Sequence, residues 1–411
     1  MSTSFKRDHP SDSVKNRIVI EKRDTRYGYL DAVRGIAASV VVLHHCLLCF
    51  PRWSGAVQHG IMPSGLGILI VYPPLNLIWS GQSAVYVFFA LSGFVLALMF
   101  MQHTAMSYAA FVAKRVCRIY LPYLAIVSLA MILMTVTAPH HLAELSEWYN
   151  SSWNRGVNLS LVVDHALMLG QQQYNYVDNP VWSLVHEMRY SLIFPVIMWF
   201  VRRKQWAVIV TGSFVISVAS MVMLNVKGYS SVVDSCQYLF LFVSGAALAI
   251  HRNEVAARIM KAALPMRVCM GVTSLLMLST RGLAFSQYWT VRRSAQIAPH
   301  IGATLLLICI IGSPQTQHFL KQKPLLWLGR VSYSLYLSHV VLLLTLVTLL
   351  HRFIPNEVLI CVTFVTTFVV SAILYQTLER PAIHLGSVLA SRIDINHPAI
   401  RPELLTRTDS V

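Results

Sequence analysis

The chain has 411 residues, of which 55% are hydrophobic and only 12% are charged. The charged share is about half that of an ordinary soluble protein, which excludes a large water-soluble domain. The formal net charge of +16 does not indicate nucleic-acid binding, because the basic residues lie in clusters between apolar runs, a pattern by which membrane proteins fix their orientation.

The apolar runs predict an all-α, polytopic membrane protein of about ten transmembrane helices, since crossing a bilayer takes about 20 residues. The predicted spans are 30–50, 80–101, 119–138, 182–201, 205–225, 232–250, 264–280, 297–313, 328–350 and 357–378. The seventh and eighth are short, so counts of eight or eleven stay open. We divide the chain into a basic tail at 1–26, expected to be disordered, a membrane domain at 27–385 and a C-terminal tail at 386–411.

Lysine and arginine lie unevenly on the two sides of this layout. With the N-terminus in the cytoplasm, roughly 24 of the 33 fall in cytoplasmic segments and about 7 in external ones. This asymmetry predicts that both termini are cytoplasmic. The longest external connector, 139–181, has an apolar stretch at Leu159–Leu169 that is expected to lie on the membrane surface or to dip into it, and its Trp148 is expected at the interface.

The first span carries ionisable residues, which are costly inside a bilayer and therefore tend to mark function. Arg34 and His45 are eleven positions apart, which places them on one helix face, roughly 16 Å apart. Asp31 lies one turn before Arg34. The pattern indicates a functional site. The alternative is an arginine that reaches the cytoplasmic surface and a histidine satisfied by a neighbour.

The third and fourth spans add further charges. Arg115 and Arg118 are expected to share a helix face, either to bind a phosphate-rich ligand such as a coenzyme A nucleotide or as plain positive-inside residues. The fourth span opens at Trp182 and places Glu187 about 8 Å deeper. There Glu187 serves a site or forms a buried ion pair that holds the helices together.

The last two spans complete the set of candidates. His339 lies near the middle of the ninth span with Tyr336 on the same face, as part of a site or as a hydrogen-bonded core histidine. Glu379, at the end of the tenth, is predicted to anchor the helix at the interface. The histidines lack the spacing of metal ligands, so no metal is predicted.

Six short segments, in chain order, carry a family resemblance. The segments are Leu30-Asp31-Ala32-Val33-Arg34-Gly35 with His45, Phe88-Phe89 with Ser92-Gly93-Phe94, Arg115-x-x-Arg118 with Pro122-Tyr123, Trp182-Ser183-Leu184-x-x-Glu187, Ser332-Tyr333-Ser334-Leu335-Tyr336-Leu337-x-His339, and Glu379-x-Pro381. Together they resemble the acyltransferase type 3 family, membrane enzymes that O-acetylate sugars of surface glycans. The chain resembles a stand-alone form without a C-terminal hydrolase-like domain, and it departs from the family at Arg189, where members commonly have an aromatic residue.

The resemblance implies a membrane O-acyltransferase. It would move an acyl group, expected to be acetyl, from cytoplasmic acyl-CoA to a sugar hydroxyl of a cell-surface polysaccharide, lipopolysaccharide or related glycan. We expect acyl-CoA as a donor substrate, no permanently bound cofactor, a free or lipid-linked glycan as acceptor, and contact with membrane lipid. The expected location is a cell membrane, namely the bacterial inner membrane.

The resemblance also assigns roles to residues. Arg34 and His45 are expected to be catalytic, with Glu187 orienting or charge-balancing a histidine. His45 suits a general base or an acyl carrier, because an imidazole has a pKa near neutrality. Coenzyme A is expected to bind Arg34, Arg115 and Arg118. The substrate cavity is expected to be lined by Asp31, Ser92, Gly93, Trp182, Tyr336 and His339.

Two other functions remain open at this point. A proton-coupled transporter or flippase of a glycolipid or small solute would also use intramembrane Arg, His and Glu. A purely structural membrane scaffold explains the topology but not Arg34 within a span. The absence of a visible internal repeat and the order of the six segments favour the enzyme.

Overall fold

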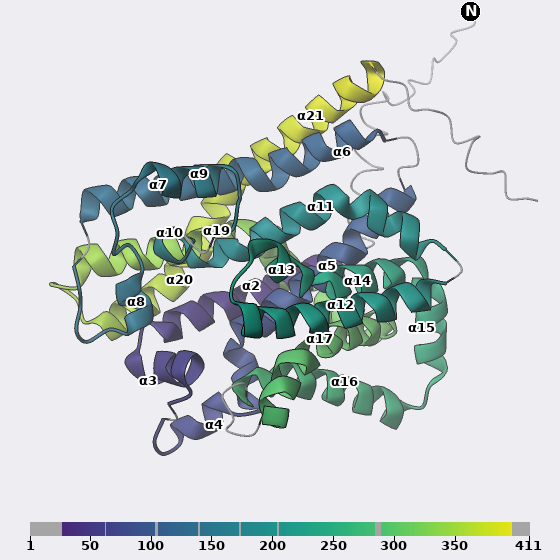
Figure 1. Cartoon of the computed structure of the whole chain (residues 1–411), viewed down its shortest axis with the longest axis horizontal. Coiled ribbons are helices and arrows are strands. Elements are labelled where there is room, and N and C mark those ends of the chain that lie inside the picture. Colours follow the sequence, from purple (N-terminus) through teal and green to yellow (C-terminus); the bar gives the residue numbers. More distant parts are fainter. Residues whose placement is uncertain are drawn as a thin grey trace, which may run out of the picture.

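The computed structural model describes residues 27–396 apart from 62, 103–105, 139, 172–173, 204 and 284–288. Throughout this part the chain forms helices and no strand, which confirms the predicted all-α fold (Figure 1). The predicted N-terminal tail lies outside the described residues, as do residues 397–411.

Among the described residues, eight helical segments are long and apolar enough to cross a membrane. They are α2 (Gly28–Leu48), α5 (Gly81–Gln102), α6 with α7 (Tyr108–Arg115 and Leu121–Thr137), α11 (Trp182–Val201), α12 (Trp206–Lys227), α13 with α14 (Ser231–Cys236 and Leu239–Ile250), α19 (Lys323–Leu350) and α20 (Asn356–Leu374). The chain is therefore a multi-pass membrane protein.

Two of the predicted spans differ from the other eight. The seventh coincides with α16 (Leu264–Ser279), which has only 16 residues. The eighth coincides with α17 (Trp289–Ile311), which is followed by α18 (Pro314–Leu320) after a bend of 94°, and the pair makes a ninth span if counted as one. All ten predicted runs fall on helices, but length alone supports eight or nine crossings of the described chain.

Two close helix crossings organise the bundle. Where α2 crosses α19, a Cβ added to Gly329 would lie 2.4 Å from the carbonyl carbon of Asp31, and one added to Gly35 would lie 2.6 Å from the amide nitrogen of Gly329. Where α5 crosses α14, a Cβ on Gly93 would lie 2.3 Å from the carbonyl oxygen of Phe242. Small residues at such crossings let backbones approach, which is how helices associate in lipid.

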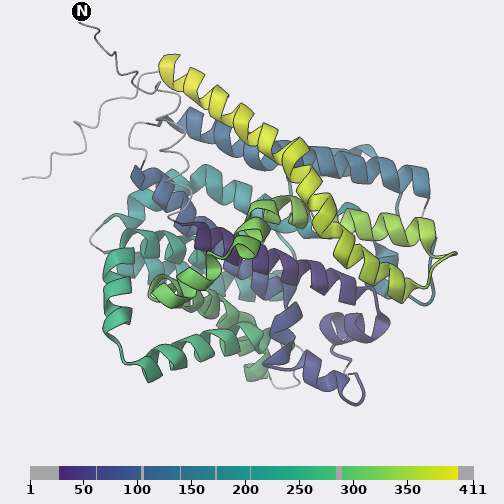
Figure 2. The same cartoon turned by 180° about the vertical axis from the view of Figure 1, so that it is seen from behind.

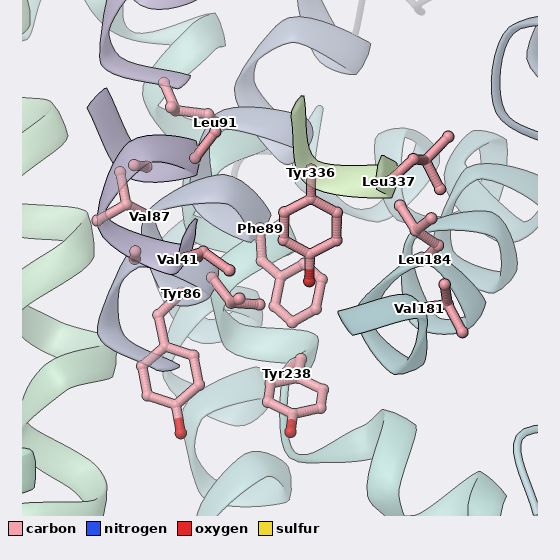
Figure 3. Close-up of a cluster of buried hydrophobic side chains, with 14 of the residues drawn as sticks. Val41, Tyr86, Val87, Phe89, Leu91, Val181, Leu184, Tyr238, Tyr336 and Leu337 are labelled. Atoms are coloured by element: carbon pink, nitrogen blue, oxygen red, sulfur yellow. The ribbon is translucent and has the colours of Figure 1, made fainter. Parts of the chain in front are cut away.

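Large side chains fill the space around these crossings. Figure 3 shows Phe89 of α5 between Tyr238 and Tyr336, with Leu184 of α11 nearby. The rings of Phe89 and Tyr238 are 4.9 Å apart at their centroids, in the tilted arrangement that aromatic pairs prefer. This packing holds α5, α11, α14 and α19 in fixed relation to one another.

We expect the substitution Gly329→Ala to destabilise the protein by about 1–3 kcal/mol, because its Cβ meets the backbone of Asp31, which cannot rotate away. Thermal unfolding of the detergent-purified protein measures this. The matched control is Gly212→Ala in α12, where an added Cβ meets nothing within 4 Å and stability should be unchanged or slightly raised. Equal loss in the two variants would contradict the described crossing.

The connector between α7 and α11 turns back into the bundle. It contains α8 (Glu147–Ser151), α9 (Leu159–Ala166), α10 (Tyr174–Val177) and the turn η4 (Asn179–Val181). The hydroxyl groups of Tyr120 and Tyr123 donate to the carbonyl oxygens of Ala166 and His165 in α9. Both tyrosines lie in the middle of the 30-residue span Tyr108–Thr137, so α9 lies alongside that span. The two placements expected for Leu159–Leu169, along the membrane surface or dipping into it, both stay predictions.

Two spans are interrupted by a π-helical turn, a feature that is frequent at functional sites. One is η3 (Val116–Tyr120), between α6 and α7, and the other is η6 (Tyr375–Glu379), between α20 and α21 (Arg380–Asn396). Helices α6 and α21 run side by side along one edge of the bundle (Figures 1 and 2). The predicted tail boundary at residue 386 falls within α21.

Candidate active site

Arg115 and Glu187 form a buried ion pair between α6 and α11. Arg115 is only 5% exposed, and its Nη2 lies 3.1 Å from Oε1 of Glu187. The same carboxylate oxygen accepts a hydrogen bond from Ser92 of α5, and Ser191 accepts from Nε and Nη2 of Arg115. Three helices thus meet at this pair. In the described part of the chain, no histidine hydrogen-bonds to Glu187.

Further charged residues gather around this ion pair. Arg34 of α2 lies within electrostatic range of Arg118, Glu187 and Glu379. Its Nη1 is 4.0 Å from Oδ1 of Asp31, whose side chain is 48% exposed. We call Arg34, Arg115, Arg118, Glu187 and Glu379 the charge cluster. It brings three cations and two carboxylates from four separate segments of the chain to one end of α2.

The predicted role of Glu379 as an interface anchor is wrong. Its side chain is only 4% exposed, and Oε2 accepts a hydrogen bond of 2.6 Å from Ser334 of α19. The turn η6 ends at Glu379, and the wider π turn directs the carboxylate into the bundle. A buried carboxylate needs compensating charge, which Arg34 and Arg118 supply from within electrostatic range.

Arg115 and Arg118, expected to share a helix face, have different surroundings. The turn η3 begins directly after Arg115, so the spacing between the two is no longer that of an α-helix. Arg115 is buried against Glu187, whereas Arg118 is exposed. Arg118 is therefore the member of the pair that a soluble anion can reach directly.

His45 and His339 form a pair of buried imidazoles near the other end of α2. They are 6% and 2% exposed, and Nδ1 of His45 lies 2.9 Å from Nε2 of His339. On its other side, Nε2 of His45 lies 3.2 Å from the side-chain oxygen Oδ1 of Asn179. The ring of Trp148 stacks on His45 with the centroids 5.3 Å apart. We call His45 and His339 the histidine pair.

Acceptor oxygens lie beside both ring nitrogens of His45. Nδ1 is 3.1 Å from the carbonyl oxygen of Val41, and Nε2 is 3.2 Å from Oδ1 of Asn179. On His339, Nδ1 is 3.2 Å from the carbonyl oxygen of Leu335. Either nitrogen of His45 can carry the single proton of the neutral imidazole, and the other nitrogen then keeps a lone pair. That lone pair can act as a base or a nucleophile.

Trp148 and Asn179 are site residues that the sequence did not reveal. Trp148 was expected at the membrane interface, but it is buried against His45. The hydroxyl of Ser146 donates to the carbonyl oxygen of Leu48, which fixes α8 to the end of α2. Asn179 lies three residues before Trp182, where the segment Trp182-Ser183-Leu184-x-x-Glu187 of the family resemblance begins. This proximity was the one sequence feature that could have indicated Asn179 as a site residue.

The remaining predicted cavity residues fall into two groups. Tyr336 lies beside the histidine pair, with its ring centroid 6.0 Å from that of His339 and its hydroxyl donating to the backbone of Pro180. Gly93 lies at the crossing of α5 with α14, against the backbone of Phe242. Trp182 packs on Tyr238 at the start of α14. The structure therefore places Gly93 and Trp182 in helix packing.

The charge cluster and the histidine pair are connected along three helices. On α2, Arg34 belongs to the charge cluster and His45 to the histidine pair. Glu187 of α11 belongs to the cluster, while Asn179, in the turn before α11, contacts His45. On α19, Ser334 contacts Glu379 of the cluster and His339 belongs to the pair. At 1.5 Å per residue, the two sites on α2 are roughly 16 Å apart. A ligand that is charged at one end and reactive at the other could therefore occupy both.

A small cavity lies beside His44, the residue that precedes His45 in α2. Its volume is about 80 Å³, and its lining includes Asn76, Trp79, Arg281 and the ring of His44, which lies 5.3 Å from that of His45. Nδ1 of His44 donates to the carbonyl oxygen of Trp79, so its Nε2 can accept a hydrogen bond from a hydroxyl group. The cavity offers both donors and acceptors, as hydroxyl groups require.

Comparison with known proteins identifies the family of the chain. A family model described as an acyltransferase domain matches residues 27–376. Over 69 residues, 17% of this chain, the sequence is 41% identical to a protein named O-acetyltransferase PaAT-1 from Phomopsis amygdali. The matched segment spans only 13% of the length of that protein. No solved structure matches the chain.

Proposed function

The chain belongs to the acyltransferase type 3 family, and from that premise we propose that this acyltransferase moves an acetyl group from cytoplasmic acetyl-CoA to a hydroxyl of a cell-surface glycan. The family match and the O-acetyltransferase relative support the enzyme class. The donor, the glycan acceptor and the cytoplasmic side of the donor site belong to the proposal, and the bacterial inner membrane stays a prediction.

The observation that carries the proposal is the buried imidazole of His45, whose two ring nitrogens contact His339 and Asn179. The ring also stacks on Trp148, and it lies on the same helix as Arg34, roughly 16 Å away. General acid–base catalysis by a positioned histidine contributes typically 10²–10⁴ in rate.

Two routes use the tautomer of His45 that has its proton on Nδ1 and its lone pair on Nε2. In direct transfer, Nε2 removes the proton of the acceptor hydroxyl while the hydroxyl oxygen attacks the thioester carbonyl. The C–S bond breaks, and the CoA thiolate takes the proton from the imidazolium, a cation on which Trp148 would stack. In the covalent route, Nε2 attacks the carbonyl, the C–S bond breaks, and the Nδ1 proton passes through His339 to the CoA thiolate. The acceptor hydroxyl then attacks the acyl carbon, the C–N bond breaks, and the hydroxyl proton returns to His45.

The charge cluster is the proposed site for the anionic part of the donor. Arg118 is exposed, Arg34 lies deeper, and Arg115 adds positive charge while paired with Glu187. Guanidinium groups suit the phosphates of CoA because they bind oxygen pairs in a fork. The pantetheine arm is an extended chain, which suits the path along α2 toward His45.

The acceptor is proposed to enter at the cavity beside His44. A hydroxyl there can donate to Nε2 of His44 and accept from Arg281. The cavity is too small for a whole sugar chain, so it would take one hydroxyl-bearing arm of the acceptor. This places the acceptor and the donor on opposite ends of α2.

The direct test is transfer from radiolabelled acetyl-CoA to cell-envelope glycans in membranes that contain or lack the protein. We expect label in the glycan fraction only when the protein is present. Failure to bind acetyl-CoA, combined with movement of a glycolipid across proteoliposomes, would instead establish the transporter.

We expect Arg118→Gln to raise KM for acetyl-CoA about tenfold or more while kcat changes less, because the substitution removes a charge-assisted contact made by the donor in every state. The matched control is Arg203→Gln, since Arg203 packs on Trp199 outside the charge cluster. Unchanged KM in Arg118→Gln would remove this residue from the donor site.

A further inference from the structure

A groove beside α16 has no part in the proposed reaction. It has a volume of about 390 Å³ and lies between α15 (Arg252–Lys261), α16 and the bend from α17 to α18. Ile259, Val268 and Cys309 are among its apolar walls, and Thr316 contributes a hydroxyl. The volume falls within the range of sites that bind small molecules.

Arg267 places a charge in this groove without a counter-ion from the protein. Its Nε is buried and has no hydrogen-bond partner. Within the residues that the structure describes, its side chain makes no hydrogen bond and no ion pair. A guanidinium group with a buried nitrogen is costly unless an anion and hydrogen-bond acceptors satisfy it. Arg267 as a whole is partly exposed, so the groove offers an open cationic site to an anion.

The position of α16 indicates where that anion comes from. A helix of 16 residues is about 24 Å long, shorter than the roughly 30 Å hydrocarbon core. Arg267 lies in its first turn, near one membrane surface, while Leu264, Val268 and Val272 are exposed on its outer side. An anion at this place meets lipid head groups on one side and acyl chains on the other.

We propose that this groove binds one anionic glycerophospholipid, with the phosphate on the guanidinium of Arg267 and an acyl chain along α16 and α17. Arg258 and Lys261, in the last turn of α15, add positive charge near its edge. The positive-inside rule assigns this end of α16 to the cytoplasm, whose membrane leaflet carries the anionic lipids. The lipid fills the gap that a short α16 and a bent α17–α18 leave in the bundle.

The first test is lipid binding measured by native mass spectrometry of the full chain, titrated with phosphatidylglycerol or phosphatidylcholine. We expect one tight phosphatidylglycerol adduct and weaker phosphatidylcholine binding. Arg267→Gln should weaken phosphatidylglycerol binding about tenfold, equivalent to about 1.4 kcal/mol. Arg258→Gln, which changes a residue outside the groove lining, should have a smaller effect. Equal binding of the two lipids, or no effect of Arg267→Gln, would overturn the proposal.

A second variant tests whether an acyl chain occupies the groove, and it leaves the charge of Arg267 unchanged. Gly271 lines the groove and a Cβ added to it meets nothing within 4 Å, so Gly271→Leu introduces a larger side chain at the groove wall. We expect it to reduce phosphatidylglycerol binding, whereas Gly212→Leu, at an equally open glycine of α12, should not. Displacement of the lipid by excess inorganic phosphate, or no loss in Gly271→Leu, would overturn the lipid assignment in favour of a soluble phosphate site.

Discussion

Replacing His45 with alanine should abolish measurable acetyl transfer while leaving the helix bundle folded. We expect kcat to fall by between about a hundredfold and ten-thousandfold, because the substitution removes the nitrogen that takes the acceptor proton or carries the acyl group. The measurement is transfer of radiolabelled acetyl groups by purified protein, with KM for acetyl-CoA determined in parallel. KM should change little, since the charge cluster lies at the other end of α2.

Two further histidine variants make this result specific. His44→Ala alters the adjacent residue, which bonds to the backbone of Trp79, and should affect acceptor KM more than kcat. His339→Gln keeps an acceptor near Nδ1 of His45 and should retain more activity than His339→Ala. Full activity in a normally folded His45→Ala protein would remove the histidine pair from catalysis.

The helices could be predicted because a lipid solvent imposes a simple rule. Every backbone polar group must be satisfied within the segment, so long apolar runs become helices and little else. The spacing of Arg34 and His45 on one helix also follows from helical geometry alone. The exceptions are α16 and the bent α17–α18, where marginal hydropathy left the prediction open and where the structure shows a short and a broken helix.

The burial of Glu379 shows what helical periodicity cannot predict. A π turn leaves no mark in the composition, because it inserts one residue into an otherwise regular helix. The turns η3 and η6 change the direction of the side chains beyond them relative to a regular α-helix. Arg118, predicted from α-helical spacing to share a face with Arg115, is exposed while Arg115 is buried. Glu379 is buried, although its place at the end of the tenth span predicted an interface anchor.

The contacts around His45 depend on tertiary packing that sequence patterns do not contain. Trp148 and Asn179 belong to a connector that turns back into the bundle, and nothing in its composition fixes that path. Arg189 helps to hold it, because its guanidinium donates to the carbonyl oxygen of Leu169 and to Ser231. Arg189, the residue that departs from the family pattern, thus connects α11 to this connector through its bond to Leu169.

The Arg115–Glu187 ion pair gives the largest expected effect on stability. Arg115→Met should lower the free energy of unfolding by about 3–5 kcal/mol, because it leaves the buried carboxylate of Glu187 without its cation. Thermal unfolding in detergent measures the loss. The matched control is Asp31→Asn, which removes a half-exposed carboxylate 4.0 Å from Arg34 and should cost less than about 1 kcal/mol.

The double variant Arg115→Met with Glu187→Leu separates structure from function. Replacing both charges with apolar groups removes the unpaired carboxylate, so much of the lost stability should return. If the pair serves the donor site, this restored protein should still have a raised KM for acetyl-CoA. If its activity returns together with its stability, the pair only stabilises the packing of α6 against α11. Arg34 and Arg118 would then be the arginines that bind the donor.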